Sequence, residues 1–459
     1  MATASHIARC VLWGAFMHSL IRPFFGDNPS APQTLFQPIP PQPMNLRLLI
    51  LLAILLALDI YAFQAIKSWL SPYKPIRRKI GYAVYLGISL VAFTLLLLNA
   101  FEVLEDWPPS AKLFVRVGLF LFWICKLPIV LLLGIDDFRR GVTWVFNKIS
   151  PVSERNTSRS RFLSMAGLVA GGIPLATLTY GVVRNAYRYR RFAEDIRIKD
   201  LPAGLEGLKI VQISDMHSGS WTQSEPLKAA VEMINAENPD IVCFTGDLVN
   251  NIATEMLPYV DIFKEVRGKY GVYSILGNHD YGDYHDWGLP RGSAERAAAQ
   301  EANMQELYQI HADLGWDLLR DENRLLDING HQLGILGVEN WGSAFRFPRK
   351  ADLAKATAGT ENCDCKVLLS HDPTHWDAKI LPGYPDIDLT LSGHTHGFQF
   401  GVEIPGFKWS PAQYLYKQWA GLYTEGTQSL YVNRGLGFLG YPGRVGILPE
   451  VTVLTLRNA

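Results

Sequence analysis

Cysteine is scarce in this 459-residue chain, and neither sign of charge is in excess. The five cysteines do not make a disulfide framework. Cys363 and Cys365 form a CxC pair in a polar loop, but a structural zinc site normally needs four ligands, so we expect no function for the pair. Lysine plus arginine and aspartate plus glutamate each total 43, so net charge gives no reason to expect a nucleic-acid partner. A chain of this length holds two or more domains.

Apolar residues make up 48% of the chain and are concentrated between residues 45 and 185. Four stretches there are long and apolar enough to span a bilayer as helices: Leu46–Ile66, Ile80–Phe101, Ala111–Ile135 and Phe162–Val183. We therefore expect residues 45–185 to be a transmembrane region. Residues 1–44 are rich in proline and phenylalanine without a clear period, and we expect a disordered tail or a wrongly assigned start there.

The charges of the loops predict the orientation of the four spans. The loops after the first and third spans are basic, whereas the loop after the second carries Glu102, Glu105 and Asp106. The basic loops favour the cytoplasm, which places the C-terminal domain on the extracytoplasmic side of a plasma or inner membrane. Four arginines after the fourth span run against this pattern: Arg184, Arg188, Arg190 and Arg191. They either attract anionic lipid head groups or belong to a solvated stalk, and we expect residues 186–204 to be a juxtamembrane linker.

Two charged residues lie inside the predicted spans, Asp59 in the first and Lys126 in the third. A lone charge within a bilayer is costly, so charges there usually have partners. We expect an Asp59–Lys126 ion pair that holds two helices together. The alternative is that Lys126 extends toward the interface while Asp59 faces a wet surface.

Short apolar runs alternate with helix-like stretches from residue 205 to residue 459. The predicted buried strands are Leu208–Ser214, Ile241–Thr245, Val272–Leu276, Lys366–Ser370 and Leu389–Ser392. Thr222–Glu237 and Ala253–Lys269 are predicted helices, and Asn329-Gly330 predicts a hairpin turn within Arg324–Val338. Strands that alternate with helices imply parallel pairing and an α/β domain.

Polar residues of metal-ligand type follow each of the five predicted strands. They form five short motifs: Asp215-Met-His217, Gly246-Asp247, Gly277-Asn278-His279-Asp280, His371-Asp372 and Gly393-His394-Thr-His396. Because the carboxyl ends of parallel strands meet at one edge of a sheet, we expect these side chains to converge. Carboxylate, imidazole and amide donors suit Mn, Fe or Zn, and two such ions about 4 Å apart can clamp a phosphoryl displacement. Asp247 is the candidate for the carboxylate shared by both ions.

These five motifs, in this order, resemble the calcineurin-like metallophosphoesterases over about Leu208 to Leu456. The resemblance implies a two-sheet sandwich flanked by helices. It also implies that one metal is held by Asp215, His217, Asp247 and His396, and the other by Asp247, Asn278, His371 and His394. By the same resemblance, His279 contacts the phosphate and protonates the leaving oxygen, and Asp280 orients His279.

The strand around Ser214 and the ending Gly446-Ile-Leu-Pro-Glu-Val-Thr resemble a bacterial membrane-anchored branch of that family. The resemblance implies hydrolysis of a phosphodiester or, as in UDP-2,3-diacylglucosamine, of a pyrophosphate, and the bilayer tether favours a lipid-linked or cell-envelope substrate. The alternatives are a general phosphodiesterase or phosphomonoesterase acting on soluble compounds, and a metal-binding membrane scaffold or sensor without turnover. Transport by the four spans is a further alternative, but they contain few polar residues apart from Asp59 and Lys126.

Three features near the motifs have two interpretations each. His375 either supports a metal role or packs on the helix after its strand, and Arg434 either binds phosphate or stabilises a turn. The aromatic stretch Trp409–Tyr423 lies either at a membrane interface or in the core beside the site, and we favour the core.

Overall fold

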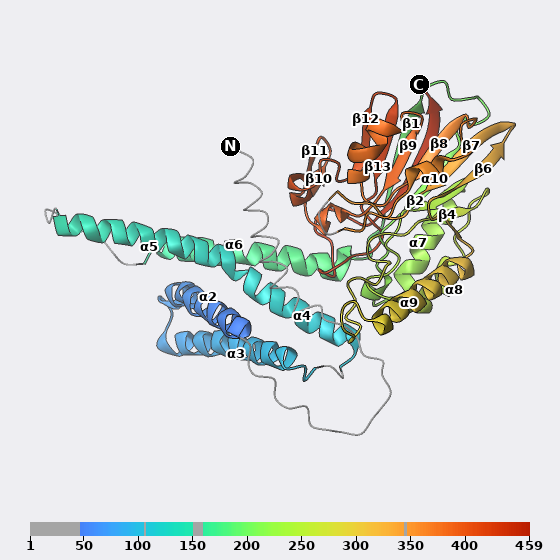
Figure 1. The fold of residues 1–459 in the computed structure, drawn as a ribbon. Helices are drawn as coiled ribbons and strands as arrows, with labels where there is room; N and C mark the ends of the chain where they lie inside the picture. The colour runs from blue at the N-terminus through green and yellow to red at the C-terminus, as the bar shows by residue number, and fades with distance from the viewer. Residues whose placement is uncertain (1–45, 105–106, 150–158, 344–346) are drawn as a thin grey trace. The chain divides into compact units, whose positions relative to one another are not determined.

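The computed structural model describes residues 46–104, 107–149, 159–343 and 347–459 (Figure 1). The predictions for residues 1–44 lie outside the described residues. The chain divides into two compact units, which meet in the sequence between Tyr180 and Gly181.

The N-terminal unit is helical. Its helices are α2 (Leu46–Leu70), α3 (Pro75–Ala100), α4 (Pro109–Ile124), α5 (Lys126–Ile149) and α6 (Arg161–Tyr180). Four candidate membrane spans, judged by length and composition, are Leu48–Leu70, Pro75–Ala100, Ala111–Ile149 and Arg161–Asn185. The four apolar spans predicted from the sequence are thus confirmed. The third is longer than predicted and consists of α4 and α5, which meet at Cys125.

The two charges inside the spans form the predicted pair. The Lys126 ammonium contacts the Asp59 carboxylate, and both residues are buried. The hydroxyls of Tyr85 and Ser89 donate to the same carboxylate oxygen at 2.9 Å and 3.0 Å. The ammonium also lies 3.3 Å from the centroid of the Phe122 ring. Residues from four helices, α2 to α5, therefore form the surroundings in which these two charges neutralise each other.

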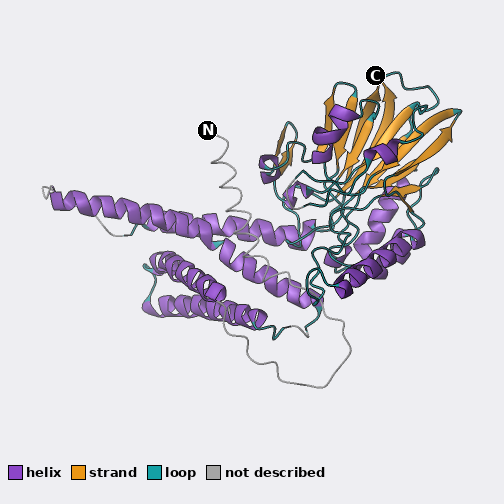
Figure 2. Ribbon diagram, viewed as in Figure 1, coloured by secondary structure: helices purple, strands orange, loops and turns teal. Residues whose placement is uncertain are grey.

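Two six-stranded sheets dominate the C-terminal unit (Figure 2). The first has the order β1 (Arg190–Ile198), β14 (Glu450–Asn458), β2 (Lys209–Ile213), β3 (Ile241–Phe244), β4 (Val272–Ser274) and β5 (Asp317–Leu318). The second has the order β12 (Gly421–Glu425), β13 (Gln428–Val432), β9 (Leu389–Ser392), β8 (Cys365–Leu369), β7 (His331–Gly337) and β6 (Glu322–Ile328). A separate hairpin joins β10 (Val402–Ile404) and β11 (Phe407–Trp409).

The core shows that the two sheets pack face to face with helices outside them. Ile210 and Leu454 of the first sheet share one buried cluster with Val367 and Leu391 of the second. Along β2 the neighbouring side chains point the other way, so Val211 packs with residues of α7 (Glu225–Ala236) and α9 (Ala294–Asp313). The helix α10 (Leu353–Thr357) packs on the outer face of the second sheet. The predicted two-sheet sandwich flanked by helices is confirmed.

Residues 190–198 differ from their prediction, because they form β1 rather than part of a juxtamembrane linker. This strand pairs in parallel with β14 from Arg190↔Glu450 to Ile198↔Asn458. Most of its side chains are exposed, and five of its nine residues are charged, as is common for an edge strand. That composition hides the apolar alternation by which a strand is recognised in a sequence.

The local predictions had mixed outcomes. The β6–β7 hairpin is confirmed, and Asn329 and Gly330 adopt φ values of 55° and 81°, as its tight turn requires. The predicted helix at Thr222 begins later, as α7 at Glu225 after Ser224. The predicted helix Ala253–Lys269 is wrong, since the segment forms two 3-10 turns and the short α8 (Val260–Phe263). Pro258 lies in the second turn and has no N–H for a continuous helix.

Candidate metal centre

The five motifs all lie at the carboxyl ends of strands. Asp215, Asp247 and Asn278 follow β2, β3 and β4, which are parallel neighbours in the first sheet. His371 and His394 follow β8 and β9, which are parallel neighbours in the second. The carboxyl ends of neighbouring parallel strands lie at one edge of their sheet. The loops that leave these edges of the two sheets meet, since His371 of the second sheet contacts Asp247 of the first.

Several predicted ligands have an unusual backbone conformation. Positive φ values between 47° and 70° occur at five of them: Asp215, His217, Asp247, His394 and His396. Residues other than glycine rarely adopt this region, and it costs on the order of 1 kcal/mol or more each. Glycines make room beside them: a Cβ at Gly277 would collide with Asp247, and one at Gly393 would collide with Asp215. The structure therefore maintains local strain where the side chains converge.

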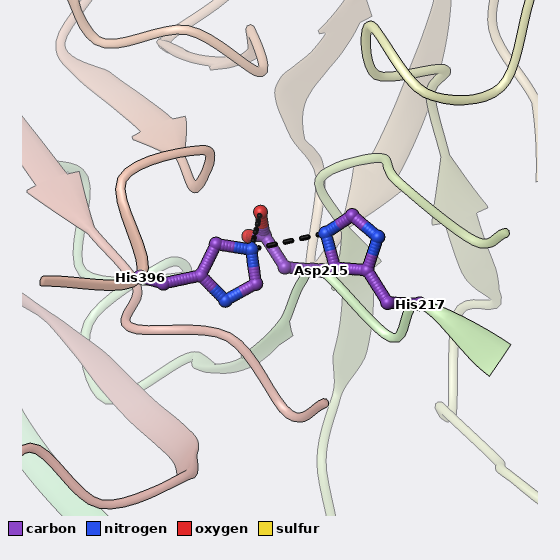
Figure 3. A group of neighbouring side chains, drawn as sticks. All are labelled: Asp215, His217 and His396. Atoms are coloured by element: carbon purple, nitrogen blue, oxygen red, sulfur yellow. Dashed lines mark hydrogen bonds and ion pairs between the residues drawn. The ribbon is translucent and has the colours of Figure 1, made fainter. Parts of the chain in front are cut away.

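Asp215, His217 and His396 form the first group of side chains (Figure 3). Nε2 of His396 lies 3.1 Å from Oδ1 of Asp215 and 3.0 Å from Nε2 of His217. All three residues are buried. Their donor atoms lie close enough together to hold one metal ion.

Asp247, His371 and His394 form the second group. Nε2 of His371 lies 3.1 Å from Oδ2 of Asp247 and 3.3 Å from Nδ1 of His394. The same Asp247 oxygen lies 3.5 Å from Nε2 of His217, which belongs to the first group. Asp247 thus stands between the two groups, in the position expected for a shared carboxylate.

Asn278 provides a test of whether a cation fits this site. Its Oδ1 is buried and has no hydrogen-bond partner among the described residues. Its Nδ2 donates to the Tyr284 hydroxyl at 3.0 Å, which fixes the orientation of the amide. A buried oxygen without a partner costs free energy, and a hard or borderline cation would satisfy it. The mixture of carboxylate, imidazole and amide donors fits a pair of divalent metals.

Contacts behind the histidines select the tautomer that a ligand needs. Nδ1 of His371 lies 2.7 Å from the carbonyl oxygen of Thr245, which can only accept a hydrogen bond. Nδ1 therefore donates to this carbonyl, which leaves Nε2, the nitrogen that faces Asp247, as the atom that would bind a metal. On the other side of the centre, Nε2 of His394 lies 3.0 Å from the Tyr416 hydroxyl, which leaves Nδ1 as the donor atom near His371.

His279 is held by a group that the sequence analysis missed. Its Nδ1 lies 2.7 Å from the carbonyl oxygen of Asn250, and its backbone N–H donates to Oδ1 of Asp247 at 2.8 Å. Asp280 was expected to orient His279, but among the described residues its carboxylate makes no hydrogen bond to the His279 ring. Asp280 instead accepts four backbone N–H groups, from Asp247, Leu248, Val249 and Gly277, at 2.8–3.2 Å. Asp280 thus fixes the loop of the central carboxylate.

Burial and neighbouring charges shift the ionisation of this centre. Burial tends to raise the pKa of Asp247, but the neighbouring histidines, His371 foremost, hold it well below its usual range. Burial tends to lower the pKa of His371, but the Asp247 carboxylate raises it to about 10. Burial, with the Asp247 charge beside it, raises the pKa of Asp280 to about 7. Burial lowers the pKa of His217 well below its usual value. Asp247 therefore stays anionic and His217 neutral, as metal ligands must be, whereas His371 would release its Nε2 proton when a metal binds.

Other candidates from the sequence have structural contacts. His375 is buried, stacks on Trp341 and lies 2.8 Å from the Ser370 hydroxyl, so it packs, although these two partners do not lie on the helix after its strand. Arg434 is buried and pairs with Glu450 at 2.5 Å and Glu403 at 2.6 Å, so it stabilises the region after β13.

The aromatic stretch Trp409–Tyr423 lies only partly in the core. Trp419 is buried, whereas Tyr414 is 70% exposed. Tyr416 lies beside His394, as described above. The sequence signal for this site neighbour was the aromatic cluster itself, but nothing in it distinguished Tyr416 from the other aromatic residues.

Family comparisons agree with the two-part organisation. Residues 46–186 match the family "Probable Calcineurin-like phosphoesterase, transmembrane domain", and residues 208–398 match "Calcineurin-like phosphoesterase". The second match contains all five motifs.

Relatives occur in bacteria and vertebrates. The chain is 29% identical over 311 residues to "Uncharacterized metallophosphoesterase YkuE" of Bacillus subtilis, which covers 66% of this chain and 99% of that protein. It is 25% identical over 389 residues to the "Transmembrane protein with metallophosphoesterase domain" of Bos taurus, covering 83% and 81%. The protein of the same description from Danio rerio is 29% identical over 286 residues, covering 61% of this chain and 60% of its own length.

Proposed function

Since the chain belongs to the calcineurin-like phosphoesterases and carries a four-helix membrane region, we propose that it is a two-metal hydrolase of phosphodiester or pyrophosphate bonds. The observation that carries this proposal is the position of the Asp247 carboxylate, 3.1 Å from Nε2 of His371 and 3.5 Å from Nε2 of His217. One carboxylate can then serve two ions, which is the arrangement that phosphoryl chemistry uses.

The ligand sets follow from the two groups. Asp215, His217, Asp247 and His396 would hold one metal, and Asp247, Asn278, His371 and His394 would hold the other. The bound ions, whether Mn, Fe or Zn, would polarise the phosphoryl oxygens and neutralise the negative charge that develops during displacement.

We assign His279 the role of protonating the leaving group. The Asn250 carbonyl fixes its ring through Nδ1, which leaves Nε2 for the substrate. Nε2 would contact the phosphate and deliver a proton to the departing oxygen. Asp280 acts on the loop rather than on the proton, because its carboxylate binds the backbone on both sides of the site.

The short connection between the membrane region and the catalytic unit is the basis for the proposed substrate class. Only nine residues separate Tyr180, the end of α6, from Arg190, the first residue of β1, so the catalytic unit stays close to the end of a candidate span. This favours a phosphorylated or lipid-linked small molecule of the cell envelope over a freely diffusing compound. The basic loops after the first and third spans favour an extracytoplasmic catalytic unit.

The test uses the purified full-length chain and bis-p-nitrophenyl phosphate, a generic aryl phosphodiester. We expect turnover that requires added Mn²⁺, is abolished by a chelator and is lost in Asp247→Ala. The matched control is Asp261→Ala, since Asp261 is an exposed carboxylate on α8. Metal content is measured in parallel. No bound metal in the natural chain would refute the proposal, and metal binding without turnover of any phosphoester would favour the sensor alternative.

A further inference from the structure

The C-terminal unit has an exposed apolar surface close to its metal centre. Seven large apolar side chains within 18 residues have exposed fractions of 41–70%: Phe398, Phe400, Val402, Ile404, Phe407, Tyr414 and Leu415. We call these seven residues the hairpin surface. Elsewhere among the described residues of this unit, such exposure occurs only at scattered positions, namely Val183, Leu257, Tyr284 and Leu325. A contiguous apolar surface on a folded unit marks an interaction site.

Four of these seven residues, Val402, Ile404, Phe407 and the neighbouring Phe400, lie in or next to the β10–β11 hairpin, which is labelled in Figure 1. The hairpin carries its apolar side chains on its exposed face. The pairs Val402↔Trp409 and Ile404↔Phe407 share one face, since side chains alternate along a strand. The other face carries the pair Glu403↔Lys408. A hairpin that served only to cover the unit would turn its apolar face inward.

The charged face is the one bound to the rest of the unit. The Glu403 carboxylate pairs with Arg434 at 2.6 Å, and the Lys408 ammonium donates to the Ala420 carbonyl at 2.5 Å. These contacts hold the hairpin with its apolar face directed away from the unit. Ile404 and Phe407 are accordingly 58% and 53% exposed.

A short segment links the hairpin surface to the place where the chain leaves its last candidate span. That span ends at Asn185, whose Nδ2 donates to the Arg444 carbonyl at 3.1 Å, and the Arg444 N–H donates to the Gly181 carbonyl at 3.3 Å. The next residue, Val445, forms a β-bridge with Phe400 of the hairpin surface. One short segment, Arg444–Val445, thus contacts both the end of the span and the hairpin surface.

Basic side chains lie at the same entry point. Arg184 and Arg188 are exposed, and Val183, in the last turn of the span, is 80% exposed. Protein surfaces at the head-group level of a bilayer typically combine exposed arginines with exposed aromatic and aliphatic residues. For Arg184 and Arg188, this arrangement favours contact with lipid head groups over a solvated stalk, whereas Arg191 pairs with Glu237 at 2.6 Å.

The metal centre lies at the border of the hairpin surface. The Phe398 ring lies 6.4 Å from the Tyr416 ring, centroid to centroid, and the Tyr416 hydroxyl lies 3.0 Å from Nε2 of His394. A phosphate at the metal centre would therefore be about one aromatic ring away from the apolar surface. That spacing matches an amphiphile whose phosphate is at the head-group level while its apolar part stays in the bilayer.

We propose that the hairpin surface inserts into the interfacial layer of the membrane that anchors the chain, and that it brings the metal centre to phosphate esters carrying acyl or prenyl chains. This inference rests on the proposed function for the identity of the reacting group. The contact with the bilayer itself does not depend on turnover, so the two can fail separately.

The first experiment measures the contact without measuring activity. Ile404→Cys and the control Leu325→Cys are introduced separately into the full-length chain, which is reconstituted in nanodiscs of phosphatidylethanolamine and phosphatidylglycerol. Leu325 is 49% exposed on β6, at the opposite edge of its sheet from β12. Each variant is labelled with bimane, and the parent chain is labelled in parallel to subtract its native cysteines. Lipids with a nitroxide at the head group should quench position 404 about five-fold more than position 325.

Two outcomes would overturn the proposal. Equal quenching at both positions would show that the hairpin surface is solvated. If position 404 is shielded only in discs that hold two or more copies of the chain, a second copy of the chain, and not lipid, covers it.

The second experiment connects the surface to the reaction. We compare turnover of a diacyl phosphodiester in nanodiscs with turnover of bis-p-nitrophenyl phosphate, for the natural chain and for Ile404→Glu combined with Phe407→Glu. The double variant should lower the ratio of lipid to soluble turnover about ten-fold or more, because two apolar side chains lose their burial. Leu325→Glu should leave this ratio unchanged. An unchanged ratio in the double variant would refute the link to the substrate, even if the quenching result stands.

Discussion

Nδ1 of His279 lies 2.7 Å from the carbonyl oxygen of Asn250. The carbonyl can only accept, so the ring donates from Nδ1 and its orientation is fixed by the backbone of a neighbouring loop. The same loop carries Asp247, three residues earlier. The His279 ring and the Asp247 carboxylate are therefore positioned relative to each other by one short segment.

Replacing His279 separates proton transfer from metal binding. His279→Ala should lower kcat on bis-p-nitrophenyl phosphate by about 100-fold or more, because general acid catalysis typically contributes this much. Bound metal, measured by mass spectrometry, should stay at the level of the natural chain, since His279 belongs to neither ligand group.

A substrate with a good leaving group provides the control for that experiment. A dinitrophenyl ester needs little protonation, so His279→Ala should lose much less activity on it. An equal loss on both esters would argue that His279 only binds the phosphate, and a loss of metal would assign it to the metal site.

Asp280→Asn should loosen the loop of Asp247. The carboxylate of Asp280 accepts four backbone N–H groups, and an amide keeps only one accepting oxygen for them. We expect the free energy of unfolding to fall by about 2 kcal/mol and the affinity for Mn²⁺ to fall with it. Urea unfolding and metal titration measure the two effects. Asp261→Asn, on an exposed carboxylate, should change neither.

Exchanging Asp59 and Lys126 should partly preserve the N-terminal unit. Either single change, Asp59→Lys or Lys126→Asp, leaves two like charges buried together and should strongly reduce the yield of monodisperse protein. The double exchange restores opposite charges and should recover much of the yield and Tm. Recovery will be incomplete, since Tyr85 and Ser89 are placed to donate to a carboxylate at position 59. A double exchange as damaging as either single change would contradict a stabilising role of the pair.

His311 should make the C-terminal unit sensitive to acid. Burial lowers its pKa to about 3, from an ordinary value near 6.5. Below about pH 6.5 the unfolded chain binds a proton at this residue that the folded chain does not, so stability falls as pH falls toward 3. Between pH 7 and pH 5 this amounts to about 2 kcal/mol.

His311→Asn removes that one titration and leaves the others in place. The difference in unfolding free energy between pH 7 and pH 5, measured with urea in chelator, should be about 2 kcal/mol smaller in the variant than in the natural chain. Its stability at pH 7 will be lower, because the Ser274 hydroxyl loses its 3.0 Å contact with the ring. An identical pH dependence in both proteins would show that His311 titrates normally in the folded state.

The sequence predicted the parts of the site that lie directly after buried strands. Asp215, Asp247 and His371 follow apolar runs that are buried on both faces of their sheets, and such runs are easily recognised. Residues that support the site from other loops were missed. Asn250 and Tyr416 carry no motif of their own, and their roles depend on tertiary contacts that spacing does not encode.

Strands with buried side chains were predicted from the sequence, whereas strands with exposed side chains were missed. The central strands were found to within two residues, whereas β1 and the β10–β11 hairpin were not identified. On β1 the exposed edge is charged, and on the hairpin the charged residues bind the unit while apolar residues face outward. Both patterns oppose the usual rule that apolar residues mark the interior.

The position of β14 has a consequence for biosynthesis. This strand is formed by the last segment of the sequence, yet it lies between β1 and β2, which are formed by the first segments of the unit. Until Glu450–Asn458 have emerged from the ribosome, β1 has no neighbour in the sheet, and one edge of β2 stays open. The C-terminal unit therefore cannot complete this sheet until Glu450–Asn458 are available, so its folding depends on pairing between strands that lie far apart in the sequence.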